Sequence, residues 1–174
     1  AMADIPALPG RPPQLCMGCP HIDTSNVINE TLKDFKQSLV TSDIGCYALG
    51  AVPPYSAIET IVCMGASVGM AKGAAEGGLY PVLAVIGDST FLHSGMSSLL
   101  DCVDANADMT LIIVDNLTVA MTGGQKTIVP SSRLSRVVEG LGVSPENIQI
   151  WDAHKRSHEK NVQLLARRRL CFED

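Results

Sequence analysis

Two short, almost wholly apolar runs of the sequence are each followed by an acidic residue. Residues 81–86 (PVLAVI) lead through Gly87 to Asp88, and residues 109–114 (MTLIIV) lead directly to Asp115. A strand with one solvent-exposed face alternates apolar and polar residues, whereas a parallel strand covered by helices on both faces is apolar throughout. The two runs therefore predict buried strands of a parallel sheet, which limits the fold to one with helices on both faces of that sheet.

Helical and strand-like segments alternate around these runs. Apolar residues at helical spacing, or closely spaced small residues, predict helices over 23–37, 65–76, 94–106 and 131–141. Further apolar stretches predict strands over 38–44 and 148–151. We therefore expect an α/β fold with a doubly wound, mostly parallel sheet and helices on both faces. Residues 1–14, rich in proline and glycine, are expected to form an extended arm before a single domain over 15–174.

Composition narrows the classes of function. The chain has 174 residues, of which 46% are hydrophobic but only 4% aromatic, so the core must be largely aliphatic. A net charge of -5 argues against a nucleic-acid-binding module, which would show a basic face. No apolar run reaches the ~20 residues of a membrane span, and the N-terminal residues lack the charged region and apolar stretch of a secretory signal, so we expect none. We expect a cytoplasmic protein that binds neither nucleic acid nor membrane.

Polar residues follow both buried strands, where ligands of parallel sheets bind. Asp88 follows the first strand and Asn116 the second, so a carboxylate and an amide oxygen can share one hard cation. Ser89 and Thr90 precede a helix, whose N-terminus favours anions. The pattern predicts a site for Mg²⁺ and a diphosphate. The alternative is that Asp88 only caps the helix and Asn116 only ends a strand.

Several motifs occur in a fixed order along the chain: CMGCPH (16–21), SDIGCYALG (42–50), CMGASVGMAKG (63–73), IGDSTFLHSGM (86–96) and DNLTVAMTGGQ (115–125). The last two resemble the thiamine diphosphate fingerprint, Gly-Asp-Gly followed later by Asn, with Ser89 in place of the common second glycine. Together the motifs resemble the thiamine-diphosphate-binding portion of indolepyruvate ferredoxin oxidoreductase, within the wider 2-oxoacid:ferredoxin oxidoreductases. The resemblance covers about residues 12–142.

The resemblance implies roles for particular residues. The Mg²⁺ ligands would be the side chains of Asp88 and Asn116 and the carbonyl of Thr118. The diphosphate would be held by Gly87, Ser89, Thr90 and Thr122. Gly45 and Cys46 would lie beside the cofactor, and Met64, next to Gly65, would support its bent conformation.

Six cysteines raise the question of a metal centre. By resemblance, the ligands of a [4Fe-4S] cluster would be Cys16, Cys19, Cys46 and Cys171. Four thiolates suit such a cluster, but they suit structural zinc equally well, and free buried thiols remain an alternative. Cys63 and Cys102 lie in apolar settings and are expected in the core.

The catalytic machinery is incomplete in this sequence. His21 and His93 are weak candidates for acid–base groups. By resemblance, the glutamate that activates the cofactor comes from a separate pyrimidine-binding domain, which 174 residues do not accommodate. The chain would therefore be half of an active site and part of an oligomer.

A departure from the relatives lies at residues 152–167, which are short for the helix and strand expected there.

The resemblance implies oxidative decarboxylation of indolepyruvate or a related 2-oxoacid, with coenzyme A taking the acyl group and ferredoxin the electrons. A subunit of a non-oxidative thiamine-dependent decarboxylase, of the sulfopyruvate or phosphonopyruvate type, is the first alternative. A decarboxylase of this type has no reason to retain Cys16, Cys19 and Cys46 together. A zinc-binding structural module is the second alternative, and it leaves Asp88 and Asn116 unexplained.

Overall fold

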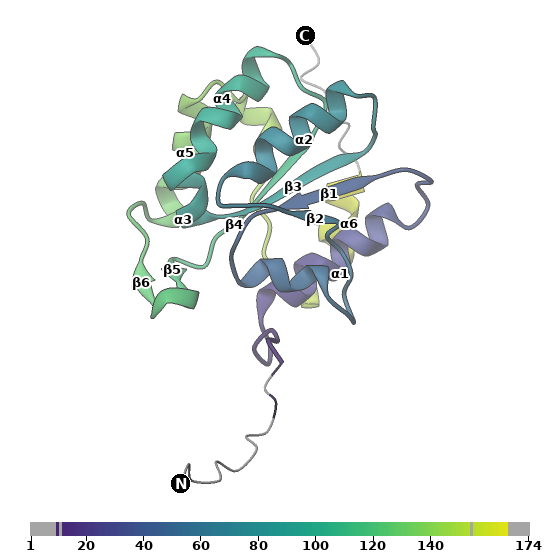
Figure 1. Cartoon of the computed structure of the whole chain (residues 1–174). Helices are drawn as coiled ribbons and strands as arrows, with labels where there is room; N and C mark the ends of the chain where they lie inside the picture. Colours follow the sequence, from purple (N-terminus) through teal and green to yellow (C-terminus); the bar gives the residue numbers. More distant parts are fainter. Residues whose placement is uncertain (1–9, 11, 154, 167–174) are drawn as a thin grey trace, which may run out of the picture.

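The computed structural model describes residues 10, 12–153 and 155–166. Its centre is a parallel sheet with the strand order β2-β1-β3-β4 (Figure 1). The strands are β1 (Leu39–Ser42), β2 (Thr60–Ile61), β3 (Val82–Gly87) and β4 (Thr110–Val114). Every residue of β3 is buried. Two further strands, β5 (Thr118–Val119) and β6 (Gln125–Lys126), form an antiparallel hairpin after β4.

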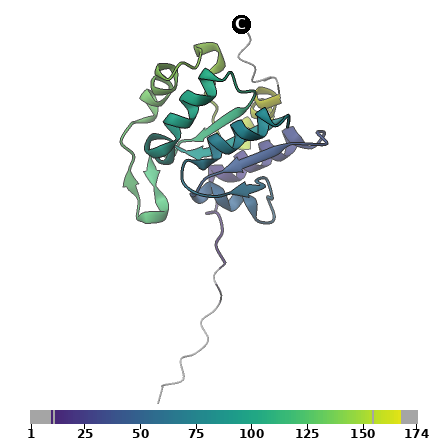
Figure 2. The same cartoon turned by 45° about the horizontal axis from the view of Figure 1, so that its top comes forward.

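Helices cover both faces of the sheet (Figures 1 and 2). One face carries α2 (Ala66–Glu76), α4 (Met96–Asp104) and α5 (Ser131–Gly140). The other carries α1 (Pro20–Leu32), the 3₁₀-helix η1 (Cys46–Ala51) and α6 (His158–Ala166). The sequence prediction of a doubly wound α/β fold is therefore confirmed. Within the described part of the chain, no helix is long and apolar enough to cross a membrane.

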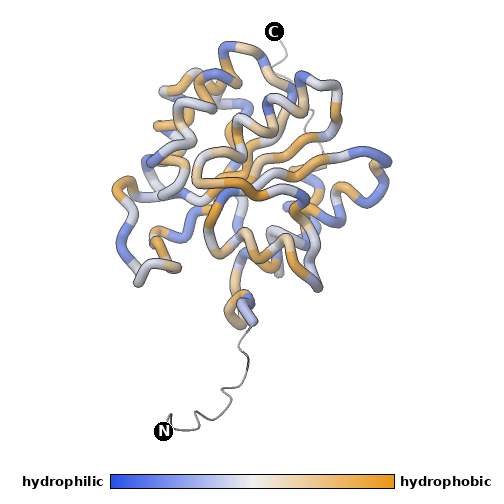
Figure 3. Tube along the Cα trace, viewed as in Figure 1, coloured by the Kyte–Doolittle hydropathy of each residue, from blue (hydrophilic) through white to orange (hydrophobic). Residues whose placement is uncertain are grey.

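The central strand places alternate side chains in two separate cores. Val82, Ala84 and Ile86 pack with residues of α2, α4 and α5, whereas Leu83 and Val85 pack towards α1 and η1. Both sets are apolar, which is why β3 reads as an uninterrupted apolar run. Figure 3 shows the same concentration of hydrophobic residues along the central strands.

The register of β3 and β4 sets the position of the residues that follow them. Leu83 pairs with Thr110 at one end, and Gly87 pairs with Val114 at the other. The two strands therefore end level with each other. Asp88 and Asp115, the next residues along each strand, leave the sheet side by side.

The structure corrects several expected element boundaries. The first helix spans Pro20–Leu32 instead of 23–37, and Pro20 stands at its first position, where a missing N–H costs nothing. The helix expected over 94–106 begins earlier, because α3 (Asp88–Thr90), a π-helical turn (Phe91–Gly95) and α4 follow without a break. Strand β2 and the β5–β6 hairpin, whose strands have two residues each, were not predicted.

The strand expected over 148–151 is absent. These residues have no regular secondary structure and pair with no described strand. Ile148 packs against one core and Trp151 against the other, so their apolar character reflects burial and not sheet pairing. Of the expected arm over 1–14, only residues 10 and 12–14 are described, without regular secondary structure; the rest lies outside the described residues.

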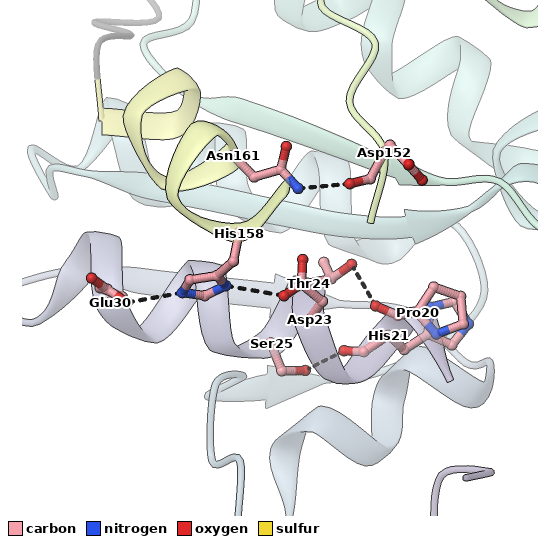
Figure 4. A network of polar contacts seen from close by, with 9 residues as sticks. All are labelled: Pro20, His21, Asp23, Thr24, Ser25, Glu30, Asp152, His158 and Asn161. Atoms are coloured by element: carbon pink, nitrogen blue, oxygen red, sulfur yellow. Dashed lines mark hydrogen bonds and ion pairs between the residues drawn. The ribbon is translucent and has the colours of Figure 1, made fainter. Parts of the chain in front are cut away.

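Helix α6 is joined to α1 by a histidine between two carboxylates (Figure 4). His158 Nδ1 lies 3.0 Å from Asp23 Oδ1, and its Nε2 lies 2.9 Å from Glu30 Oε2. Carboxylates only accept hydrogen bonds, so both ring nitrogens must carry hydrogen, which is the charged imidazolium. Hydrogen bonding to Glu30, and then to Asp23, accordingly raises the pKa of His158.

This contact predicts a pH-dependent stability. Because the folded-state pKa of His158 is raised, its contribution is complete below the ordinary value and is lost as pH rises through the raised value. Raising the pH from about 6 to about 8.5 should therefore lower the melting temperature of the wild type more than that of His158→Gln, by at most about a few °C. Thermal unfolding across that range measures the difference, with the exposed His93→Gln as control. Parallel curves for wild type and His158→Gln would contradict the prediction.

Candidate functional site at the carboxyl ends of the strands

Asp88 joins the ends of the two central strands. It is only 4% exposed, and it begins the helix that follows β3. Its Oδ1 accepts a hydrogen bond from the backbone N–H of Ser89 at 2.7 Å, and its Oδ2 accepts one from Leu117 at 3.1 Å. Burial raises the pKa of Asp88, and the nearby Asp115 carboxyl raises it further. Two carboxyl groups thus meet where like charges are costly unless a proton or a cation is bound.

The loop after β4 wraps around Asp88. Leu117 has a left-handed backbone, with φ of 59°, which makes the turn tight. Asp115 Oδ1 accepts from the Leu117 N–H at 3.1 Å, and Asn116 Oδ1 accepts from the Thr118 N–H at 3.1 Å. The side-chain oxygens of Asp115 and Asn116 therefore lie in the same turn whose Leu117 N–H contacts Asp88. This donor set is the kind that Mg²⁺ prefers, so the residues fit the expected ion.

Asp43 fixes the loop before α2 to the end of β1. It is fully buried, and its Oδ1 accepts from the Ser67 N–H at 2.9 Å while its Oδ2 accepts from Ser67 Oγ at 2.7 Å. The backbone amides of Gly65 and Ala66 also hydrogen bond to it. Burial raises the pKa of Asp43, and these hydrogen bonds oppose that rise. The predicted cofactor residues Met64 and Gly65 are thereby held beside the sheet, and Met64 is 47% exposed.

Tyr47 packs against the glycines of two strand ends. A Cβ at Gly45 would overlap the Tyr47 ring, and a Cβ at Gly87 would lie 2.8 Å from its Cε1. The Tyr47 hydroxyl donates to the carbonyl of Ile44 at 3.4 Å and also hydrogen bonds with the Thr90 side chain. Burial raises the pKa of Tyr47. Both glycines are therefore required by close approach of this ring.

His21 lies against the same tyrosine. The two rings meet edge to face, with centroids 6.0 Å apart. Burial lowers the pKa of His21, which favours the neutral imidazole. His93, the other histidine considered for acid–base chemistry, is exposed on the π-helical turn. Of the two, only His21 is buried next to residues of the strand ends.

Gly65 adopts a conformation that other residues avoid. Its φ is 85°, and a Cβ there would lie 2.6 Å from Ser94 Cβ and 2.9 Å from the Ser94 carbonyl oxygen. Gly65→Ala should therefore destabilise the fold by about 2 kcal/mol or more. Gly73→Ala is the matched control, because nothing lies within 4 Å of a Cβ there and alanine favours helix. Chemical denaturation should separate the two variants; equal stability would contradict the role of Gly65.

Three of the predicted cluster cysteines, Cys16, Cys19 and Cys46, are among the described residues, and the first two affect the pKa of the third. The Cys19 N–H donates to the Cys16 carbonyl at 3.1 Å. Burial raises the pKa of Cys46, and the neighbouring Cys19 and Cys16 thiols raise it further. None of the three is in a disulfide, and in the described part of the chain no group of three or more His, Cys, Asp or Glu is placed to hold a metal. Cys171 lies outside the described residues.

The remaining predictions have mixed outcomes. Cys102 is buried as expected, but Cys63 is exposed, because it lies in the loop before α2 and not within the helix. The Thr122 hydroxyl lies 2.6 Å from Gln125 Oε1, so its hydrogen bonding stays within the β5–β6 hairpin. Asp43 and Tyr47 were not singled out from the sequence, although the polar residues of SDIGCY inside an apolar stretch were a usable signal.

Residues 43–157 match the family described as thiamine pyrophosphate enzyme, C-terminal TPP binding domain. The chain belongs to this family. Thiamine pyrophosphate, or TPP, is another name for thiamine diphosphate. The match begins at Asp43 and includes Asp88 and residues 115–118, so these polar groups lie within the TPP-binding domain, whereas Cys16, Cys19 and His21 precede the matched residues.

Curated relatives named indolepyruvate oxidoreductase subunit IorA match most of the chain. The Methanothermobacter thermautotrophicus protein is 38% identical over 166 residues, covering 93% of this chain and 26% of the relative. The Archaeoglobus fulgidus protein is 44% identical over 117 residues, covering 67% and 19%. The Pyrococcus horikoshii protein is 36% identical over 195 residues, covering 94% and 30%. The resemblance found in the sequence is confirmed, and the chain spans less than a third of the length of these relatives.

Solved structures support the fold. A 2-oxoglutarate:ferredoxin oxidoreductase from Magnetococcus marinus superposes with a TM-score of 0.58 at 22% identity, covering 67% of this chain and 42% of that one. Benzoylformate decarboxylase from Polynucleobacter necessarius gives 0.54 at 16% identity, covering 94% and 33%. The TPP-binding fold is thus common to an oxidative and a non-oxidative enzyme.

Proposed function

We propose that this chain is the TPP- and Mg²⁺-binding half of an oxidoreductase that oxidatively decarboxylates indolepyruvate or a related 2-oxoacid. Ferredoxin is the electron acceptor, and coenzyme A takes the acyl group. The observation that carries the proposal is the buried Asp88 carboxylate, which bridges the ends of β3 and β4 beside Asp115. The names of the curated relatives support the substrate class.

In this proposal the strand ends hold the cofactor. The Mg²⁺ ligands are the side chains of Asp88 and Asn116 and the carbonyl of Thr118. The diphosphate is held by Gly87, Ser89, Thr90 and Thr122, the last of them from the β5–β6 hairpin. The rest of the cofactor lies beside Gly45, Cys46, Met64 and Gly65. When bound, TPP supplies the electron sink that permits loss of CO₂ from a 2-oxoacid.

His21 is proposed as the acid–base group of this half-site. Its lowered pKa keeps the imidazole neutral near pH 7, so it can accept a proton and return it. Its ring contact with Tyr47 fixes its position, and Tyr47 in turn packs against Gly87. His93 is a weaker candidate because it is exposed.

Cys16, Cys19, Cys46 and Cys171 are proposed to hold a [4Fe-4S] cluster. The support is that three of them approach closely enough for their thiols to affect one another. A cluster of this kind binds thiolates, so its assembly would be favoured by deprotonation of Cys46. Zinc at the same cysteines is the competing occupant, and iron and sulfide analysis separates the two.

The other half of the site is proposed to come from a pyrimidine-binding domain or subunit in an oligomer. Large apolar residues are exposed beyond the strand ends, on loops at Ile44, Val62, Met64 and Leu117, and in the short 3₁₀-helix Ala120–Thr122 at Met121. Exposed apolar residues grouped around a ligand site mark an interaction surface. The glutamate that activates the cofactor is expected from the domain that covers this surface.

The test is reconstitution of the chain, purified without oxygen, with its pyrimidine-binding partner. We expect reduction of ferredoxin that depends on indolepyruvate, coenzyme A and TPP–Mg²⁺, together with bound iron and sulfide. Release of CO₂ without ferredoxin reduction would instead support the non-oxidative decarboxylase. Zinc in place of iron, with no TPP binding in the complex, would overturn the proposal.

A further inference from the structure

The Tyr47 side chain contacts several parts of the candidate site at once. Tyr47 is buried and lies in η1, shortly after the end of β1. Its ring packs against Gly87 at the end of β3 and meets the ring of His21 edge to face. Its hydroxyl hydrogen bonds with the Thr90 side chain and with the backbone of Gly87. Tyr47 therefore lies between His21 and two of the residues proposed to hold the diphosphate.

The Tyr47 hydroxyl has a single hydrogen to donate, and two neighbours can accept it. The Ile44 carbonyl oxygen is 3.4 Å away, beyond the range of about 2.5–3.0 Å that is usual for a hydroxyl donor and an oxygen acceptor, so this contact is weak. The Thr90 hydroxyl is the other acceptor, and it can also donate. The Tyr47–Thr90 pair can therefore be ordered in two ways, with the hydrogen of either hydroxyl pointing to the oxygen of the other.

A diphosphate bound at Thr90 would select one of these two orders. Phosphate oxygens accept hydrogen bonds strongly, so the Thr90 hydroxyl must donate to them. Thr90 is buried, and its oxygen then needs a donor from within the protein. The Tyr47 hydroxyl is in contact with it. Hydrogen bonds that follow one another in this way, from Tyr47 through Thr90 to the ligand, strengthen each other.

We infer that Tyr47 is a positioning residue of the diphosphate subsite: its hydroxyl donates to Thr90 Oγ1 and thereby directs the Thr90 hydroxyl hydrogen to the diphosphate. This role rests on the proposed function, because Thr90 is a proposed diphosphate ligand. The Tyr47 ring contacts His21 and Gly87 through its carbon atoms. Removing the hydroxyl alone should therefore weaken cofactor binding while the contact with His21 remains.

The test is a double-mutant cycle of Tyr47→Phe and Thr90→Val, with TPP affinity as the measured quantity. Titration calorimetry at saturating Mg²⁺ uses the chain in complex with its pyrimidine-binding partner, and thermal unfolding without TPP checks that each variant is folded. We expect Tyr47→Phe to weaken TPP binding about five- to tenfold. Thr90→Val should weaken it at least as much. The double variant should bind like Thr90→Val alone, because Tyr47 acts through Thr90.

Three further measurements support the cycle. Tyr80→Phe is the matched control and should bind TPP like the wild type, because Tyr80 is 43% exposed and precedes β3 at the end opposite Gly87. In a Thr90→Ser background, which keeps a hydroxyl, Tyr47→Phe should again weaken binding. In turnover assays, Tyr47→Phe should raise the KM for TPP by the same factor as the Kd, and kcat at saturating TPP should change far less.

Three results would overturn the inference. Wild-type TPP affinity in Tyr47→Phe would show that the hydroxyl does not assist binding. Effects of Tyr47→Phe and Thr90→Val that multiply in the double variant would show that Tyr47 does not act through Thr90. A lower kcat with unchanged TPP affinity would show that the hydroxyl acts on the reaction and not on the diphosphate. Failure of the wild-type complex to bind TPP is a separate outcome, which would overturn the proposed function and this inference with it.

Discussion

Asp88→Asn should abolish binding of TPP and Mg²⁺ while leaving the fold intact. The substitution removes one of the charges that hold the cation, so we expect cofactor affinity to fall by about a hundredfold or more. Stability should change little, because two effects oppose each other. The buried charge beside Asp115 is relieved, but the introduced amide has a single oxygen and cannot accept from both Ser89 and Leu117 as the two carboxylate oxygens do.

Titration calorimetry with TPP and Mg²⁺, alongside thermal unfolding without ligand, measures both quantities. Asp34→Asn, at an exposed position just after α1, is the matched control and should bind normally. Since Mg²⁺ needs the ionised carboxylate and the pKa of Asp88 is raised, wild-type affinity should fall as the pH drops through that raised value. Wild-type affinity in Asp88→Asn would show that the charge of Asp88 is not needed to hold the metal.

Asp43→Ala should cause the largest loss of stability among these variants. It leaves the buried Ser67 N–H and Oγ–H, and the amides beside them, without their acceptor. Each orphaned group costs about 1–3 kcal/mol, so we expect a loss of about 3 kcal/mol or more. For a chain of this size that lowers the melting temperature by roughly 6–12 °C.

Asp43→Asn distinguishes the hydrogen bonds from the charge. The oxygen of the introduced asparagine can accept from the Ser67 N–H while its amide nitrogen donates to Ser67 Oγ, so both contacts persist in altered form. The stability of this variant should lie within about 1 kcal/mol of the wild type. Chemical denaturation of the two variants and of Ser67→Ala gives the comparison. If Asp43→Asn were as damaging as Asp43→Ala, the charge itself would be responsible.

The sequence predicted the fold best where a buried strand is followed directly by an acidic residue. The apolar runs before Asp88 and Asp115 identified β3 and β4, because a strand covered on both faces cannot alternate. The same reasoning failed at residues 148–151, whose apolar side chains are buried without sheet pairing. Periodicity reports which side chains avoid water and says nothing about which backbone groups pair.

The residues at the strand ends could be identified from the sequence, but the contacts that support them could not. Asp88 and Asn116 follow strand ends directly, so their proximity follows from the topology alone. Asp43 contacts Ser67 across 24 positions of sequence, and Tyr47 reaches Gly87 from a different strand end. Such contacts depend on three-dimensional packing, which local sequence does not encode. The proximity of Cys46 to Cys16 and Cys19 came from resemblance and not from spacing.

The level ends of β3 and β4 make the spacing of Asp88 and Asp115 a property of the sheet and not of the loops. Insertions in the β5–β6 hairpin after Thr118 would leave that spacing untouched, although they would displace Thr122, which is proposed to hold the diphosphate. Deleting one residue inside Val82–Gly87 would be different. It would displace Asp88 by about 3.3 Å and turn the remaining side chains to the opposite face. The length of β3 is therefore fixed by the position that Asp88 must reach beside Asp115.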